Sequence, residues 1–289
     1  MNINPKDFRV PIGKRLHLQQ RATKTEPIYK SEQHYKELLN ADVEELSALQ
    51  RFLYASNSHS ILLIFQAMDT AGKDGAISHV LSGVNPQGCE VYSFKHPSEE
   101  ELEHDFLWRT TCRLPGRGRI GVFNRSYYEE VLIARVHPAI LRSEKLPDQR
   151  LGKDEVWKGR FESISALEHH LHRNGTRVIK FFLHLSKEEQ RRRLLERIDD
   201  PAKNWKFSQA DITERGFWDQ YMRAYEQCLS ATSTKNARWY VVPADDKFNA
   251  RLIVSRVVID TVRELHLQFP QLTATQRTAL RSIRNELLQ

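Results

Sequence analysis

The sequence predicts an α/β fold with three layers, in which a mostly parallel central sheet carries helices on both faces. Apolar runs without polar alternation are typical of strands buried on both sides of such a sheet, and residues 61–65 read ILLIF. Stretches with a helical spacing of apolar residues separate these runs, which favours parallel strands joined by helices. The chain has 289 residues, 40% of them hydrophobic, and is long enough for one such domain with a full core.

The expected elements follow one another in a regular order. Residues 1–30 are polar and basic, so we expect an arm on the surface, and residues 31–55 space their leucines as an amphipathic helix does. The expected strands are 61–65, 90–94, 119–124, 178–185 and 239–243. The expected helices after the first are 73–81, 99–113, 127–136, 153–174, 187–199, 211–230, 249–267 and 273–288. We divide the chain into an N-terminal arm (1–30), one domain (31–270) and a C-terminal helix (271–289).

The composition favours a polyanionic partner. Lysine and arginine number 44 against 37 acidic residues, so the net charge is +7, and such a balance attracts nucleic acid, anionic lipid or phosphorylated substrates. No apolar run approaches the ~20 residues that span a bilayer. The first residues also lack the apolar segment of a signal peptide, and we expect a cytoplasmic protein without a membrane partner. The three cysteines have no metal-site spacing and are expected to be reduced.

A phosphate-binding loop is expected at residues 66–75, which read QAMDTAGKDG. The segment follows the first buried strand and opens a helix, where backbone N–H groups and a helix N-terminus form an anion site. Lys73 would supply a point charge to the phosphate. The consensus G-x-x-x-x-G-K-[ST] is altered twice, because Ala67 replaces the first glycine and Asp74 replaces the hydroxyl residue. The alternative is an ordinary strand-to-helix turn.

Three further residues are candidates for chemistry at this loop. A carboxylate at Asp69 would repel phosphate unless it binds a cation or a proton, so Asp69 is a magnesium ligand, a general base or a solvated bystander. Asn124 ends an expected strand where P-loop enzymes place a metal-binding acid, and its amide can hold a metal-bound water. Arg125 can bind phosphate with two hydrogen bonds, or it forms a surface ion pair.

Residues 187–206 are strongly basic and are expected to form a lid. In nucleotide kinases a lid at this place closes over phosphates and excludes water. Arg193 and Arg197 are four residues apart and share one helix face. The alternative is a solvated helix face, which is the usual meaning of a run of charges. Residues 168–172 (EHHLH) match no zinc signature and are interpreted as structural.

These motifs together resemble the polyphosphate kinase 2 family. The matching segments are QAMDTAGKDG (66–75), SGVNPQGCEVYSFKHPS (82–98), HDFLWR (104–109), FNRSYYEEVLIARVHP (123–138), FFLHLSKEEQRRRLLERIDDPAKNWKFS (181–208) and WYVVPADDK (239–247). Six separate motifs occur in order, and the likeness runs from about residue 31 to 267. The family often has Asp where this chain has Asn124, and the NRSYYEE segment looks more like the subgroup that acts on both AMP and ADP.

The resemblance implies a P-loop kinase fold with an Arg-rich helical lid, and Mg²⁺-dependent phosphoryl transfer between inorganic polyphosphate and nucleotides. The implied substrates are AMP, ADP and ATP, with GMP and GDP as further candidates, in a homo-oligomer that has no nucleic-acid partner. Asp69, Lys73 and Arg125 would be catalytic, and Asp69 and Asn124 would hold the metal, Asn124 through water. The implied phosphate-binding residues are Ala71, Gly72, Lys73, Asp74, Gly75, Arg125, Arg193, Arg197, Lys203 and Lys206.

Three alternatives stay open. An ATP-dependent nucleoside or nucleotide kinase on the same scaffold would work with ATP and fail with polyphosphate. A basic nucleic-acid-binding protein could use the loop for regulation, although the sequence contains no recognised nucleic-acid module. The third is an inactive family member, since Ala67, Asp74 and Asn124 depart from a generic P-loop enzyme.

Overall fold

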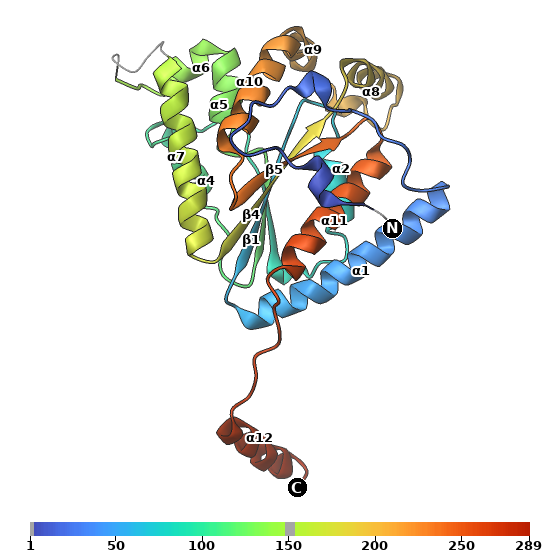
Figure 1. Ribbon diagram of the computed structural model, residues 1–289, viewed down its shortest axis with the longest axis vertical. Coiled ribbons are helices and arrows are strands. Elements are labelled where there is room, and N and C mark those ends of the chain that lie inside the picture. Colours follow the sequence, from blue (N-terminus) through green and yellow to red (C-terminus); the bar gives the residue numbers. More distant parts are fainter. Residues whose placement is uncertain (1–2, 148–153) are drawn as a thin grey trace.

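The computed structural model describes residues 3–147 and 154–289, without the side chain of Lys206. Within these residues, five strands form one parallel sheet in the order β2-β3-β1-β4-β5 (Figure 1). The strands are β1 (Ser60–Ala67), β2 (Cys89–Ser93), β3 (Ile120–Asn124), β4 (Thr176–His184) and β5 (Ala237–Pro243). All five expected strands are therefore confirmed, and the prediction of a mostly parallel sheet is confirmed, because the five strands pair with one another only in parallel.

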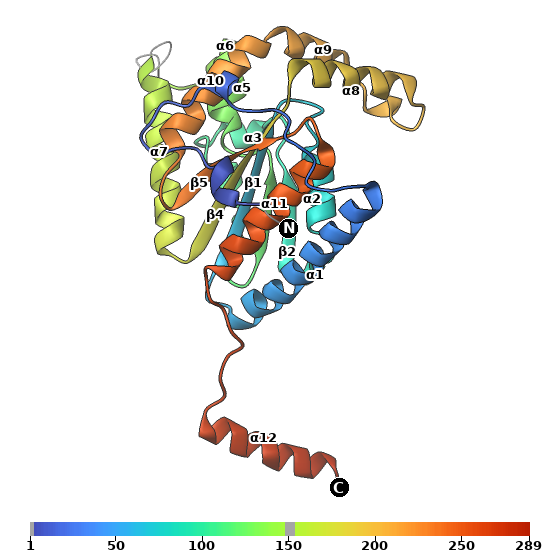
Figure 2. The same ribbon diagram turned by 45° about the vertical axis from the view of Figure 1, so that its right-hand side comes forward.

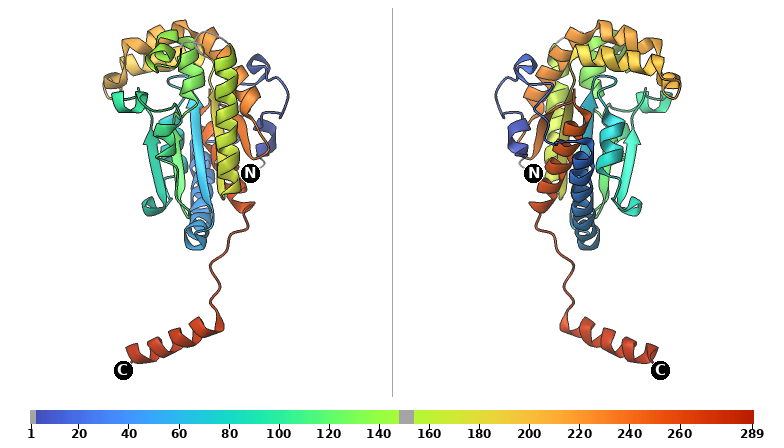
Figure 3. Two further views of the ribbon diagram at one scale, coloured as in Figure 1. Left: turned by 90° about the vertical axis from the view of Figure 1, so that its left-hand side faces the viewer. Right: turned by 90° about the vertical axis from the view of Figure 1, so that its right-hand side faces the viewer.

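Helices cover both faces of the sheet, as Figure 3 shows with the sheet seen along its edge. One face carries α1 (Glu32–Ser56), α2 (Lys73–Val80) and α11 (Lys247–Arg263), and the other carries α5 (Glu129–Val136), α7 (Asp154–Arg173) and α10 (Trp218–Thr232). The expected three layers are thus present.

The central position of β1 in the sheet explains why residues 61–65 are all apolar. Leu63 and Phe65 pack in the core below α1 and α11, whereas Leu62 and Ile64 pack in the core against α5 and α10. All four side chains are at most 1% exposed. Each such burial is worth about 1.5–3 kcal/mol, so both faces of the strand must be apolar.

Two expected helices are broken in the structure. Residues 99–113 form two short helices, α3 (Glu99–Leu102) and α4 (Trp108–Thr111), because the Asp105 carboxylate accepts a 2.9 Å hydrogen bond from the Leu107 N–H and forms a turn between them. Residues 211–230 fall in α9 (Gln209–Gly216) and in α10, which are separated by Phe217. The short helix α6 (Pro138–Ser143) was not expected, and it begins with proline in its first turn.

The N-terminal arm is more than a surface segment. It runs along the outer edge of β5, where the Val10 N–H donates to the Trp239 carbonyl at 2.9 Å and Arg9 forms an antiparallel bridge with Tyr240. Val10, Leu16 and Leu18 are buried with 0%, 4% and 2% exposure. The polar composition of the arm concealed these apolar positions, and the arm protects an edge strand from pairing with other chains.

A lid and a separate helix complete the fold. The lid consists of α8 (Lys187–Asp199), the short helix η5 (Asn204–Lys206) and α9, and it extends beyond the carboxyl ends of the strands (Figure 2). The helix α12 (Ala274–Leu287) lies away from the domain at the end of an extended segment (Figures 1 and 3). No helix in the described part of the chain is both long and apolar enough to cross a membrane.

Candidate active site

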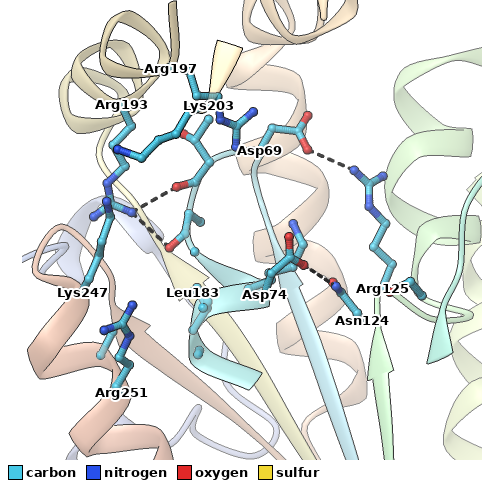
Figure 4. Close-up of a pocket in the computed structure, with 18 of the residues that line it drawn as sticks. Asp69, Asp74, Asn124, Arg125, Leu183, Arg193, Arg197, Lys203, Lys247 and Arg251 are labelled. Atoms are coloured by element: carbon cyan, nitrogen blue, oxygen red, sulfur yellow. Dashed lines mark hydrogen bonds and ion pairs between the residues drawn. The ribbon is translucent and has the colours of Figure 1, made fainter. Parts of the chain in front are cut away.

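A cavity of about 670 Å³ lies at the carboxyl ends of the strands, where parallel sheets bind their ligands. Residues of α8, α11 and the segment after α8 line one side, and β3 and the residue after it line the other (Figure 4). The lining is Asp69–Ala76, Ser93–His96, Asn124, Arg125, Leu183, Arg193, Glu196, Arg197, Lys203, Lys247, Ala250 and Arg251. Nearly all the residues predicted for phosphate or metal binding are therefore brought together.

The loop after β1 contains the residues that the sequence predicts to bind phosphate, and we name it the phosphate loop. It turns with a 3.3 Å hydrogen bond from the Ala71 N–H to the Met68 carbonyl, and Gly72 has a φ of +99° as the N-cap of α2. This left-handed backbone favours glycine. The first N–H groups of α2 have no partner within the helix, so they are available to an anion. Ala67 is tolerated in place of glycine because it is the last residue of β1 and has extended backbone.

Lys73 lies inside this loop. Its Nζ donates a 3.0 Å hydrogen bond to the Ala67 carbonyl, so the side chain folds back across the loop. Burial, and next the charge of Arg125, lowers the pKa of the Lys73 ammonium, whereas Asp69 raises it. The Lys73 amino group therefore lies within the loop that the sequence predicts to bind phosphate.

Asp69 and Arg125 form an ion pair at the cavity. Their side chains meet at 3.0 Å (Figure 4), and the Glu129 carboxylate lies 3.4 Å from the other arm of the Arg125 guanidinium. Glu129 above all raises the pKa of Arg125, so the guanidinium remains charged. Asp69 is 30% exposed and Arg125 38% exposed, which leaves both accessible to a ligand.

Strained backbone occurs at Arg125 and at Thr70, the residue after Asp69. Thr70, next to Asp69, has a φ of +65°, and Arg125 has a φ of +66°. A non-glycine residue in this region costs about 1–3 kcal/mol, and such residues occur preferentially at functional sites. The Arg125 N–H donates to the Phe65 carbonyl at 3.0 Å, so β1 helps to hold this strained residue beside the loop.

The two unusual polar positions contact each other. The Asn124 amide donates a 2.6 Å hydrogen bond to the Asp74 carboxylate. Asp74 stands where a hydroxyl residue is usual, and Asn124 stands where an acid is usual. An acid at both positions would place two negative charges in contact, which the amide avoids.

The basic lid divides into residues of different kinds. Arg191 and Arg192 point outward and pair with Glu188 and Glu189, so the interpretation as a solvated face describes them correctly. Arg197 lines the cavity and pairs with Asp211 of α9 at 3.1 Å.

Arg193 is buried, with 4% exposure, against the phosphate loop. Its NH1 group donates to the carbonyls of Thr70 and Ala71, both at 3.1 Å. This differs from the expected phosphate contact, because the guanidinium is hydrogen-bonded to protein. Lys203 lines the cavity and pairs with Asp200 at 2.7 Å. The Lys206 side chain lies outside the described part of the structure.

Sequence reasoning missed three cationic residues of the lining. These are Lys95 and the pair Lys247 and Arg251, which lie one turn apart on α11 (Figure 4). Arg251 donates a 3.1 Å hydrogen bond to the Tyr35 hydroxyl and lies over the Phe248 ring. Asp246 is the N-cap of α11, and this capping signal could have placed the helix start two residues earlier and shown the pair.

The residues present fit a magnesium ion held largely by substrate. No cluster of three or more His, Cys, Asp or Glu side chains suited to a metal occurs among the described residues. Mg²⁺ commonly takes one or two carboxylates, water and substrate phosphates rather than a full protein cage. Asp69 and Asp74 provide such carboxylates at the cavity, and Asn124 is hydrogen-bonded to Asp74.

Comparisons with known proteins agree with this geometry. Residues 29–270 match the model of the family described as polyphosphate kinase 2. The chain is 61% identical to the ADP-polyphosphate phosphotransferase of Rhodopseudomonas palustris over 290 aligned positions, which cover all of both proteins. It is 44% identical to the AMP/ADP-polyphosphate phosphotransferase of Meiothermus ruber over 78% of this chain and 80% of that protein. The crystal structure of polyphosphate kinase 2 from Arthrobacter aurescens TC1 matches with a TM-score of 0.86 and 38% identity, over 97% of each chain.

Proposed function

The chain belongs to the polyphosphate kinase 2 family, and on this basis we propose that it transfers phosphoryl groups reversibly between inorganic polyphosphate and nucleotides. The proposed reactions convert AMP to ADP and ADP to ATP. Curated relatives with these acceptors in their names support both steps. The observation that carries the proposal is the cavity, in which a phosphate loop faces many cationic side chains.

The two walls of the cavity suit two different substrates. Lys203, Lys247 and Arg251 lie together on one side (Figure 4), where they can hold a chain of phosphates with little demand on its shape. The opposite side carries Asp69, Asn124 and Arg125 and can orient an acceptor phosphate.

Catalysis of phosphoryl transfer is mainly positioning and charge stabilisation. Lys73 and Arg125 would stabilise the negative charge of the transferred group from two elements, α2 and the end of β3. Arg197 would reach the phosphates from the lid after leaving Asp211. We propose that Asp69 holds a metal ion or accepts the proton of the acceptor phosphate.

We propose Mg²⁺ as the metal. When bound, the ion would neutralise phosphate oxygens. Asp69 and Asn124, which both line the cavity, would hold it, Asn124 through water. Asp74, which is hydrogen-bonded to Asn124, would be a further carboxylate at the same position.

The wider substrate range and the assembly are also part of the proposal. The cavity residues are suited to phosphate, so we include GMP and GDP as acceptors. We propose a homo-oligomer in the cytoplasm, where nucleotide acceptors occur. Leu280, Ile283 and Leu287 give α12 an exposed apolar face that supports self-association, because a helix of 14 residues is marginal alone.

An assay with a single donor tests the function. Purified protein is given polyphosphate and Mg²⁺ with AMP, ADP, GMP or GDP, and no other donor. We expect AMP to yield ADP, and ADP to yield ATP. If only ADP reacts, the proposed acceptors are reduced to ADP, whereas polyphosphate is still the donor. No reaction with polyphosphate, together with phosphorylation of a nucleoside by ATP, would replace the proposal by an ATP-dependent kinase.

A further inference from the structure

Every N–H group of the Arg193 guanidinium is used by the protein. The Nε donates to Glu189 at 2.7 Å, NH1 donates to Thr70 and Ala71, and NH2 donates to the carbonyls of Ala244 at 2.6 Å and Asp245 at 3.0 Å. Arginine has five N–H donors. All five have acceptors in the described structure, so none is left to bind a phosphate.

The four carbonyls belong to two separate loops. Thr70 and Ala71 precede Gly72 in the phosphate loop, and Ala244 and Asp245 form the loop after β5. The planar fork of one guanidinium thus joins both loops and fixes their separation. Thr70 has a positive φ, and such a residue keeps this backbone only where its surroundings hold it.

The loop after β5 is itself held from two further directions. The Asp245 carboxylate accepts hydrogen bonds at 2.8 Å from the Ser186 N–H, at the start of α8, and from the Thr23 hydroxyl of the N-terminal arm. The Asp245 N–H donates to the Thr23 carbonyl at 2.9 Å. Arg193 therefore connects the phosphate loop to a fixed part of the molecule.

Arg197, one turn further along α8, provides the contrast. Both arginines line the cavity, but Arg197 is one-quarter exposed and has a single described partner, Asp211. Its guanidinium can change partner when phosphate arrives, whereas that of Arg193 would have to release two loops.

We propose that Arg193 is a positioning residue that holds the phosphate loop in its active shape by joining it to the loop after β5, and that it does not bind phosphate. The inference rests on the proposed polyphosphate-dependent transfer. Arg193 and Arg197 look equivalent in the sequence, but the inference gives them different roles. Of the two, only Arg197 would bind phosphate from α8.

Charge and geometry can be separated by substitution with lysine. Arg193→Lys keeps the positive charge but cannot reach four carbonyls, and lysine is a competent phosphate ligand. We expect Arg193→Lys to lower kcat by roughly 100-fold, as a small misplacement of reacting groups does, and Arg193→Ala to do the same. Retention of most activity in Arg193→Lys, with loss in Arg193→Ala, would assign a phosphate contact and overturn the proposal.

Salt dependence supplies a readout that a positioning role does not change. Polyanion binding weakens with salt in proportion to the cationic contacts made. The slope of log KM for polyphosphate against log salt should be unchanged in both Arg193 variants and shallower in Arg197→Ala. Arg191→Ala changes an outward residue of the same helix that pairs with Glu188; it is the matched control and should behave as wild type. A shallower slope in Arg193→Ala would contradict the inference.

Amide hydrogen exchange tests the loop without any turnover. In Arg193→Lys, protection of residues 69–76 should fall, whereas Arg197→Lys should leave it unchanged. This result does not depend on the donor, so a wild type inactive with polyphosphate would refute the proposed function and leave the loop measurement valid. Equal protection in wild type and Arg193→Lys would refute the positioning role.

A variant outside the core covers the case in which both Arg193 variants fail to fold. Thr23→Val removes the hydroxyl that donates to Asp245. We expect it to fold, with a several-fold lower kcat and an unchanged salt slope. An unchanged kcat would then count against the connection and overturn the proposal.

Discussion

The Asn124 amide donates to the Asp74 carboxylate at 2.6 Å, so the two unusual residues at the carboxyl end of β3 and the start of α2 form one pair. Each residue compensates for the unusual residue type of the other. The carboxylate of Asp74 has a donor, and the strand carries no second negative charge beside it.

Asn124→Asp should make the protein depend on a cation for stability. Two carboxylates about 4 Å apart repel by about 1 kcal/mol in bulk water and by up to about 4 kcal/mol near a protein surface, and a bound Mg²⁺ would remove this repulsion. We expect a lower Tm without metal than in wild type, and a larger rise in Tm when Mg²⁺ is added. The double variant Asp74→Asn/Asn124→Asp swaps the two residues, so the pair again has a single carboxylate, and it should resemble wild type. Identical Mg²⁺ responses in the single variant and wild type would show that the pair is not coupled to a cation.

Asp69→Asn should fold normally and lose at least ~100-fold in turnover, the size expected for a catalytic group. The amide cannot take a proton and holds metal weakly, and it also loses the ion pair with Arg125. Steady-state kinetics across Mg²⁺ concentrations separate the roles. Partial recovery at high Mg²⁺ indicates a metal ligand, whereas no recovery with an altered pH profile indicates a base. Near-normal turnover under both conditions would leave Asp69 with a role in loop shape alone.

Asp211→Asn should tighten polyphosphate binding. Asp211 forms an ion pair with Arg197 at 3.1 Å, and burial raises the pKa of Asp211, with Asp69 as the next cause. Loss of its charge frees Arg197, so we expect the KM for polyphosphate to fall two- to five-fold by weakening a competing ion pair.

The same argument predicts a pH effect with a definite sign. Protonation of Asp211 begins at a higher pH than for an ordinary aspartate, so the wild-type KM should fall as pH is lowered, and the variant should lack this part of the change. Asp199→Asn, an exposed acid of the same lid, is the control. An unchanged KM in Asp211→Asn would show that the pair does not restrain Arg197.

Glu130 should make the fold less stable as pH rises. Burial above all raises the pKa of Glu130 from 4.5 to about 7, against the lowering effect of Arg109, with which it pairs at 2.9 Å. The folded protein then binds this proton more tightly than the unfolded chain, so stability is lost between pH 4.5 and 7, on the order of 3 kcal/mol in total. Urea unfolding at pH 5 and pH 8 measures it. Glu130→Gln cannot ionise and should lose less stability over this range; an equal loss would assign the effect to other groups.

The sequence alone was sufficient to predict those elements whose conformation is determined by their own local residue pattern. The run ILLIF is typical of a strand with two buried faces, and Lys73 after Gly72 is the order expected where an anion loop opens a helix. The turn at Asp105 and the break at Phe217 could not be predicted from periodicity, because tertiary contacts and one side-chain hydrogen bond decide them.

The residues of the site likewise include some that the sequence could predict and some that it could not. Asp69, Lys73 and Arg125 lie at the cavity because strand ends bring them there. Arg193 and Arg197 look alike in the sequence, since a charge and a period of four cannot tell which carbonyls a guanidinium will meet. The difference depends on the loop after β5, which lies more than 40 residues further along the chain.

The position of Thr23 beside Asp245 also bears on how the molecule acquires its activity. The contacts that support the phosphate loop join residues 222 positions apart, and closing so long a segment is entropically costly and slows folding. During synthesis the early strands can associate first, but the support beneath the phosphate loop is incomplete until the ribosome has released the segment after β5. Nascent chains should therefore carry an unsupported anion loop until late in translation, and activity should appear abruptly rather than grow with chain length.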